Sequence, residues 1–166
     1  MDLPKRKANR LTGYDYSGSG TYFLTLCSKR KQHLFSHIVG RGILDAPELQ
    51  LTECGKCIDE TLTYLAEHNE SIDVEKYVIM PNHVHLLVSV GGGNGGASGM
   101  PRPTMNALIP KFVSSLKRFT NKQCGAELWQ NGYYDHIIRD ENDYLSRWRY
   151  IDENPLKWTQ DEYFDE

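Results

Sequence analysis

Four short stretches of the chain have the hydrophobic and polar pattern of β-strands. In the first, Tyr22, Leu24 and Leu26 fall on one face of an extended chain, and glycines and charged residues bound the run. The second and third are joined by Pro-Asn, which favours an antiparallel hairpin. The four predicted strands are residues 20–30, 71–80, 83–90 and 132–140.

Three other stretches repeat apolar residues at helical spacing. The first is predicted to open at Pro47 and to end near Asn69, and the third to end before Pro155. The second is interrupted early by Pro110. Its predicted apolar face is formed by Leu108, Phe112, Leu116 and Phe119. The three predicted helices are residues 46–69, 104–123 and 141–154.

The order of these elements is β-α-β-β-α-β followed by a final helix. This order predicts an α+β protein with the ferredoxin-like split βαβ fold, in which a four-stranded antiparallel sheet carries helices on one face. We expect an additional C-terminal helix and one domain over residues 1–166. Within it, residues 1–20 are predicted to be a basic N-terminal arm and residues 91–103 a flexible glycine-rich loop.

The net charge of −3 conceals a marked separation of charge along the chain. Residues 1–31 hold seven Lys and Arg against two acids, and residues 104–139 hold five against two. Residues 140–166 hold nine acids against three basic side chains. Two basic segments leave a polyanionic partner open, with solvated surface charge as the alternative.

No apolar run is long enough to span a membrane, and the basic N-terminus is not followed by the apolar segment of a signal peptide. We therefore expect a cytoplasmic protein without membrane contact. Cys54 and Cys57 have the CxxC spacing of zinc and redox sites, but no second pair stands nearby. Their helical surroundings favour thiols on a half-buried helix, and we expect no zinc site.

The hairpin stretch VIMPNHVHLLVSV contains two histidines in an otherwise apolar run. His83 and His85 are two residues apart, so both side chains project from the same face of a strand. Two imidazoles on one face can bind a metal ion and leave positions for oxygen ligands. The alternative is a pair of half-exposed histidines on a sheet. A histidine-triad nucleotide hydrolase would need a third histidine where Leu87 stands.

The C-terminal stretch RWRYIDENPLKW places Tyr150 and Asn154 four residues apart, on one helix face. A tyrosine can attack a phosphodiester, and an amide oxygen can bind a hard cation. The alternative is a packed aromatic residue with a polar helix cap. Pro155 disfavours α-helical backbone at Asn154, which weakens the predicted geometry. Tyr133 and Tyr134 lie in a predicted strand, and Tyr144 lacks an oxygen ligand four residues on.

Taken together, the motif series resembles the REP-associated tyrosine transposases, relatives of the HUH single-tyrosine transposases. The resemblance covers nearly the whole chain and rests on three segments. They are RLTGYDYSGSGTYFLTLCSKRKQHLF, VIMPNHVHLLV and WQNGYYDHIIRDENDYLSRWRYIDENPLKW.

The resemblance implies residue roles by position. Tyr150 matches the catalytic tyrosine, and His83, His85 and Asn154 match the metal ligands, with Mg²⁺ or Mn²⁺ as the ion. His136 matches a recurrent family histidine, for which an anchoring hydrogen bond is expected.

The implied activity is nicking and joining of single-stranded DNA beside a hairpin, through a 5′-phosphotyrosine intermediate, in DNA transposition. A catalytically silent DNA hairpin-binding protein is the main alternative, and a metal-dependent nucleotide hydrolase is a third. We favour a homodimer formed through sheet edges over a monomer. The basic side chains expected to bind DNA are Lys5, Arg6, Lys7, Arg10, Lys111, Lys117 and Arg118.

Overall fold

The computed structural model describes residues 20–40, 47–91 and 105–164, with side chains from residue 108 onward in the last range. The predicted N-terminal arm and glycine-rich loop therefore lie outside the described residues, apart from Gly20 and Gly91. The same holds for the arm's four basic residues, Lys5, Arg6, Lys7 and Arg10. In the described part of the chain, no helix is both long and apolar enough to cross a membrane.

The described residues form six strands, three α-helices and two short 3-10 helices. The strands are β1 (Gly20–Cys27), β2 (Ser36–Val39), β3 (Glu48–Leu51), β4 (Ile72–Ile79), β5 (His83–Val90) and β6 (Tyr134–Ile137). The α-helices are α1 (Glu53–Glu67), α2 (Met105–Cys124) and α3 (Glu141–Glu153). The 3-10 helices are η1 (Lys29–Lys31) and η2 (Trp158–Gln160).

Four strands form one antiparallel sheet in the order β4-β5-β1-β6. Each of the two connections that contain a helix, from β1 to β4 and from β5 to β6, skips one strand of the sheet. This is the split βαβ arrangement. The sequence prediction of an α+β fold with a four-stranded antiparallel sheet is therefore confirmed.

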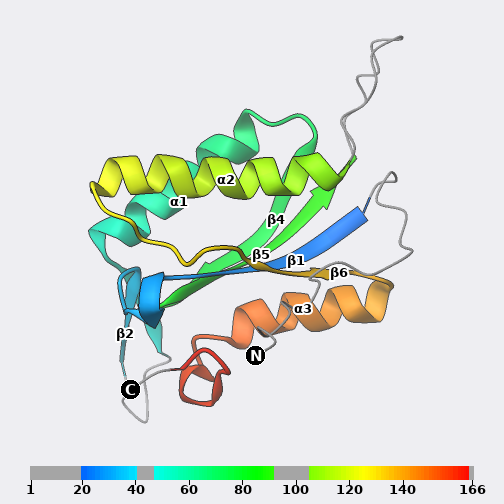
Figure 1. Ribbon diagram of the computed structural model, residues 1–166. Coiled ribbons are helices and arrows are strands. Elements are labelled where there is room, and N and C mark those ends of the chain that lie inside the picture. The colour runs from blue at the N-terminus through cyan, green and yellow to red at the C-terminus, as the bar shows by residue number, and fades with distance from the viewer. Residues whose placement is uncertain (1–19, 41–46, 92–104, 165–166) are drawn as a thin grey trace, which may run out of the picture.

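The helices cover both faces of the sheet (Figure 1). Helices α1 and α2 pack side by side on one face, and α3 lies across the other. Leu24, Leu86 and Val88 of the sheet are fully or almost fully buried against the α1–α2 layer, with Ile58 and Leu116 from the helices. On the opposite face, Phe23 and Leu87 form a second, smaller core with Ile151 of α3.

Burial on both faces explains why β5 is apolar almost throughout. Its even-numbered residues, such as Val84 and Leu86, face α1 and α2. Its odd-numbered residues, including Leu87, point toward α3. The two histidines therefore lie on the α3 side of the sheet, away from the larger core.

The predicted start of the first helix is wrong. Residues 46–69 are predicted to be helical, but α1 begins only at Glu53, and Glu48–Leu51 pairs with Ser36–Val39 as a two-stranded sheet. The helix begins at Glu53 because the Thr52 hydroxyl caps it by accepting a hydrogen bond from Gly55 N at 3.1 Å. The pairing partner is distant in sequence, so helical periodicity alone did not reveal the strand.

The buried face of α2 differs from the prediction at one position. Phe112 and Leu116 are buried as expected, but Phe119 is 37% exposed and Thr120 is fully buried in its place. The Thr120 hydroxyl donates to the Leu116 carbonyl and accepts from the indole of Trp129, both at 2.8 Å. A hydroxyl is stable in the core here because both of its bonds are made.

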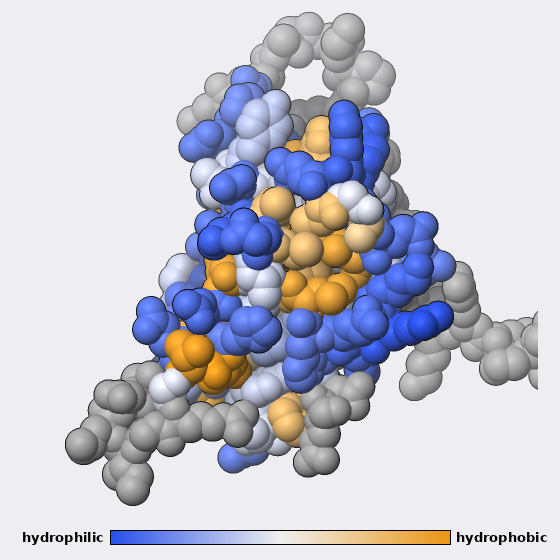
Figure 2. Space-filling view, turned by 90° about the vertical axis from the view of Figure 1, so that its left-hand side faces the viewer, coloured by the Kyte–Doolittle hydropathy of each residue, from blue (hydrophilic) through white to orange (hydrophobic). Residues whose placement is uncertain are grey.

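Three free thiols lie close together where α1 begins and α2 ends. Cys54 and Cys57 are half-buried on α1, as predicted, and Cys124 lies near both at the end of α2. Burial, with these neighbouring thiols, raises the pKa of Cys124 to about 12. Figure 2 views the molecule from this end and shows a central area of apolar side chains and a smaller one at the lower left, both bordered by hydrophilic residues.

Candidate active site

The sheet register places both histidines beside β1. His85 lies opposite Thr25, and His83 lies opposite Cys27. Both imidazoles are almost completely buried, and their ring centroids are 4.4 Å apart. The alternative of half-exposed surface histidines is therefore wrong, because the α3 side of the sheet is covered at this point.

Asn82 fixes the protonation of the His83 ring. The Asn82 amide donates from Nδ2 to the Tyr163 carbonyl at 2.8 Å, so its Oδ1 faces His83 Nδ1, at 2.9 Å. An amide oxygen only accepts, so His83 must carry its proton on Nδ1. The lone pair of the neutral ring is then on Nε2, which is the arrangement that a metal-binding histidine requires.

His85 is held from β1 by a hydroxyl. Its Nδ1 lies 2.8 Å from the Thr25 hydroxyl, which again leaves Nε2 for another ligand. Among the described residues, the Nε2 atoms of His83 and His85 are buried and have no hydrogen-bond partner. Buried polar atoms without partners are rare, so this pair requires an explanation.

Burial keeps both imidazoles neutral. It lowers the pKa of His83 to about 4, although the Asp161 carboxylate and the Asn154 side chain act in the opposite direction. Burial, together with the His83 and Arg147 side chains, lowers the pKa of His85 well below its usual value. Neutral imidazoles at physiological pH can bind a cation without first losing a proton.

Helix α3 brings the predicted tyrosine and asparagine to the histidines within a single chain. The ring of Tyr150 lies 5.1 Å from that of His85, edge to face. Asn154 has φ −57° and ψ −43°, so its backbone stays α-helical despite Pro155, and the expected distortion is not found. Its Oδ1 is buried and has no partner among the described residues, like the two imidazole nitrogens.

Asp161 joins this group and was missed by the sequence analysis. Its carboxylate accepts hydrogen bonds from the Tyr150 hydroxyl, at 3.1 Å, and from the Asn154 amide. It also lies with His83 and His85 so that one ligand atom from each falls within 4.8 Å of the others. In the sequence it was one of nine acids in an acidic C-terminal segment, with no spacing to distinguish it.

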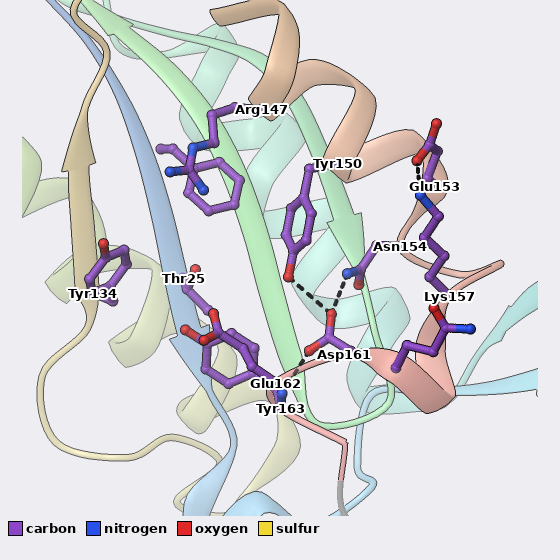
Figure 3. A pocket seen from close by; sticks show the side chains of 12 residues that line it. Thr25, Tyr134, Arg147, Tyr150, Glu153, Asn154, Lys157, Asp161, Glu162 and Tyr163 are labelled. Carbon is purple, nitrogen blue, oxygen red and sulfur yellow. Dashed lines mark hydrogen bonds and ion pairs between the residues drawn. The ribbon is translucent and has the colours of Figure 1, made fainter. Parts of the chain in front are cut away.

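The Tyr150 hydroxyl opens into a cavity of about 550 Å³. Figure 3 shows Tyr150 and Asn154 from α3 converging on Asp161, while Thr25 and Tyr134 from the sheet strands form the other side. Burial raises the pKa of Tyr150, and the negative charge of Asp161 raises it further. Without a cation nearby, this phenol stays protonated at neutral pH.

The donor set fits a divalent metal ion. Within the described part of the chain, two neutral imidazole nitrogens and one amide oxygen have no partner, and a carboxylate lies beside the imidazoles. Imidazole suits transition metals, and oxygen ligands suit Mg²⁺ and Mn²⁺. A cation here would bind the buried atoms that the protein leaves unpaired, while Thr25 and Asn82 orient the rings from behind.

The other tyrosines are placed differently. Tyr144 donates its hydroxyl to Glu75 at 2.5 Å, away from the histidines. Tyr134 is half exposed at the edge of the cavity. Tyr163 was not considered in the sequence analysis, yet its ring lies 4.8 Å from that of His83. It is the second tyrosine close to the imidazoles.

His136 makes the expected anchoring contact. Its Nε2 lies 2.8 Å from the Asp143 carboxylate, which connects β6 to the first turn of α3. The same carboxylate accepts from Arg139 N at 3.2 Å. His136 therefore helps to hold the helix that carries Tyr150.

The predicted DNA-binding residues of α2 lie on the opposite layer from this cavity (Figure 1). Lys111 and Arg118 are exposed. Lys117 instead donates to the carbonyls of Gln130 and Gly132, at 2.8 and 2.5 Å, and so holds the loop before β6. Contact of these three side chains with DNA stays a prediction.

Comparison by sequence finds three related proteins. An "Uncharacterized protein" of Haemophilus influenzae is 29% identical over 96% of this chain and 93% of its own length. A "Putative REP-associated tyrosine transposase" of the same organism is 26% identical over 48% of this chain and 47% of its own length. A "REP-associated tyrosine transposase" of Escherichia coli is 25% identical over 55% of this chain and 48% of its own length. No protein-family model matches the chain.

Comparison by structure finds the same family name. A REP-associated tyrosine transposase bound to a REP hairpin superposes with a TM-score of 0.60 and 20% identity, over 95% of this chain and 74% of the other. At this identity, the match establishes a shared fold. With the sequence relatives, it confirms the resemblance that the motif series predicted.

Proposed function

We propose, from the premise that the chain is a relative of the REP-associated tyrosine transposases, that it is a metal-dependent DNA nicking and joining enzyme. Its substrate is single-stranded DNA next to a hairpin, and its nucleophile is Tyr150. The product is a 5′-phosphotyrosine bond and a free 3′-hydroxyl. The solved relative bound to a REP hairpin supports hairpin DNA as the partner.

One observation carries the proposal. Three buried atoms, the Nε2 atoms of His83 and His85 and the Oδ1 of Asn154, have no partner among the described residues and gather beside Tyr150. A protein with only a structural use for these residues would pair them, because an unpaired buried polar atom costs about 1–3 kcal/mol. Binding of a metal ion would explain why these three atoms lack a protein partner.

In the proposed reaction, the Tyr150 oxygen attacks the phosphorus and the bond from phosphorus to the 3′-oxygen breaks. The hydroxyl proton passes to Asp161, whose carboxylate already accepts its hydrogen bond at 3.1 Å. The leaving 3′-oxygen takes up one proton from water. The same steps in reverse, with another 3′-hydroxyl as the nucleophile, join DNA ends without an external energy source.

His83, His85 and Asn154 would hold the ion, for which we propose Mg²⁺ or Mn²⁺, while the Asp161 carboxylate accepts the phenol proton. When bound, the ion supplies positive charge that neutralises the phosphate and makes loss of the phenol proton easier. The residues around it keep water away, since Phe23 packs against both His85 and Tyr150, at ring-centroid distances of 5.0 and 5.9 Å.

The test is covalent capture of DNA. The protein is incubated with Mn²⁺ and a pool of hairpin oligonucleotides that have random single-stranded arms and a fluorescent 3′ end. A 5′-phosphotyrosine adduct then retains the label on a denaturing protein gel. We expect an adduct with the wild-type protein, none with Tyr150→Phe, and an adduct with Tyr163→Phe.

The two tyrosine variants form a matched pair, because both rings lie beside the imidazoles and each loses only a hydroxyl. An adduct that survives in Tyr150→Phe and disappears in Tyr163→Phe would transfer the nucleophile role to Tyr163. Hairpin binding by the wild-type protein without any adduct would instead favour a catalytically silent DNA-binding protein.

A further inference from the structure

Arg147 occupies a position on α3 that neither the motif series nor the metal site explains. It precedes Tyr150 by three residues, so the two side chains leave the helix on neighbouring turns of one face. Both line the same cavity. Figure 3 shows Arg147 beside Tyr150 at the wall of this cavity.

The aromatic cluster of the site fixes the guanidinium. Its central carbon lies 5.2 Å from the centroid of the Phe23 ring, within the range of a cation–π contact. Phe23 is buried and stacks on His85, with an angle of 28° between the rings. The guanidinium thus packs on the same Phe23 ring that contacts His85 and Tyr150.

Much of the hydrogen-bonding capacity of Arg147 is unused by the described residues. Its Nε is buried and makes no hydrogen bond among the described residues. Asp143 forms an ion pair with Arg147, but the 3.6 Å from its carboxylate to Nε is too long for a hydrogen bond. The other cation at the cavity, Lys157, is paired with Glu153.

A guanidinium presents five N–H donors in a plane, which matches two oxygens of one phosphate group. The Arg147 guanidinium is fixed, partly dehydrated and without a full set of partners. A further hydrogen-bond partner would be an anion whose oxygens can enter the cavity that Tyr150 also lines. A phosphodiester meets these conditions.

We propose that Arg147 binds a non-bridging oxygen of the phosphate that Tyr150 attacks, and so acts as a catalytic residue. This inference rests on the proposed function and adds a residue to it. Negative charge on these oxygens increases as the phosphorus takes its fifth ligand, so a fixed cation stabilises the transition state more than the ground state. A purely structural arginine would have no such effect.

The experiment compares two arginines of the same helix. Arg147→Gln and Arg149→Gln each remove one positive charge from α3, but Arg149 is exposed and does not line this cavity. We expect hairpin affinity to fall to a similar extent in both. The rate of adduct formation at saturating DNA should fall about 100-fold or more in Arg147→Gln. It should change by less than about twofold in Arg149→Gln. Equal rates in the two variants would overturn the proposal.

A second measurement uses the wild-type protein and does not depend on catalytic activity. The Nε–H signal of Arg147, identified by its absence in Arg147→Lys, is followed by NMR while inorganic phosphate is added. We expect a saturable shift. If the protein forms no adduct with any hairpin, the proposed function fails, and this titration decides the phosphate site alone. An Nε–H signal that phosphate leaves unchanged overturns the site.

Discussion

At the scale of single residues, the geometry of the site depends on contacts behind the imidazoles. Asn82 sets the proton of His83 on Nδ1 because its own amide group is oriented by the Tyr163 carbonyl. Thr25 holds His85 from the neighbouring strand. Such supporting groups decide which ring nitrogen can bind a cation, so their loss should weaken metal binding even though they never touch the ion.

We predict that Asn82→Ala lowers Mn²⁺ affinity about 10- to 100-fold, because the His83 ring loses its orienting partner. Isothermal titration calorimetry of the metal-free protein measures the change. Asn131→Ala, in the exposed loop before β6, serves as the control and should leave affinity unaltered. Unchanged affinity in folded Asn82→Ala protein would show that Asn82 has no such role.

The metal-free protein should lose stability in acid because of its buried histidines. The pKa of His83 falls to about 4 on folding, so between about pH 4 and about pH 6.5 the unfolded chain binds a proton that the folded chain does not. Stability therefore rises with pH across this window and levels off above it. His85 acts in the same direction.

Urea denaturation from about pH 4.5 to about pH 7.5 tests this expectation. His83→Gln should lower the slope of stability against pH by up to about one proton. Asn131→Ala, in the exposed loop before β6, removes no titratable group and serves as the control. A slope of the opposite sign would mean that the folded protein favours the charged imidazole.

At the scale of elements, the start of α1 is fixed by a close backbone contact. A Cβ on Gly55 would lie 2.0 Å from the Phe35 carbonyl oxygen, which belongs to the segment leading into β2. We predict that Gly55→Ala destabilises the protein by about 3 kcal/mol or more, since a backbone atom cannot move aside easily.

The matched control is Gly125→Ala. Its Cβ would meet nothing within 4 Å, and the cost is that of a φ of +63°, about 1 kcal/mol. Denaturant midpoints of the two variants measure the difference. Equal losses would show that the segment around Phe35 yields more readily than its contacts indicate.

How far the sequence predicts these elements depends on whether their patterns are local. Alternation located β1, the Pro-Asn junction located the hairpin of β4 and β5, and the HxH spacing placed both imidazoles on one face. Strands β2 and β3 were missed because they pair with each other across a connection and carry little periodicity. Asp161 and Arg147 were missed for a related reason, since only the packing of α3 and η2 against the sheet gives them a role.

At the scale of the whole molecule, the candidate site and the basic residues of α2 lie on opposite faces of one sheet (Figure 1). A hairpin bound in the cavity would have to reach around an edge of the sheet, at β4 or β6, to touch α2. Those edges are also where a homodimer would form, if that sequence prediction holds.

We predict that replacing Lys111 and Arg118 together by Gln weakens hairpin binding and reduces the salt dependence of affinity by about two counter-ions. The rate of adduct formation at saturating DNA should not change, because neither residue lines the cavity. Fluorescence anisotropy over a salt series measures the slope. Lys56→Gln, on α1 and paired with Glu53, is the control. An unchanged slope would remove α2 from the DNA-binding surface.

The candidate ligands come from both sides of one interface, with His83 and His85 on β5 and Asn154 at the end of α3. A cation bound by all three would link the sheet to the helix that carries Tyr150. Chelation should then loosen this helix before the rest of the fold, and hydrogen exchange in α3 should slow as the ion is restored. The concentration of the ion would then control how rigidly Tyr150, the proposed nucleophile, is held, as well as the charge at the DNA phosphate.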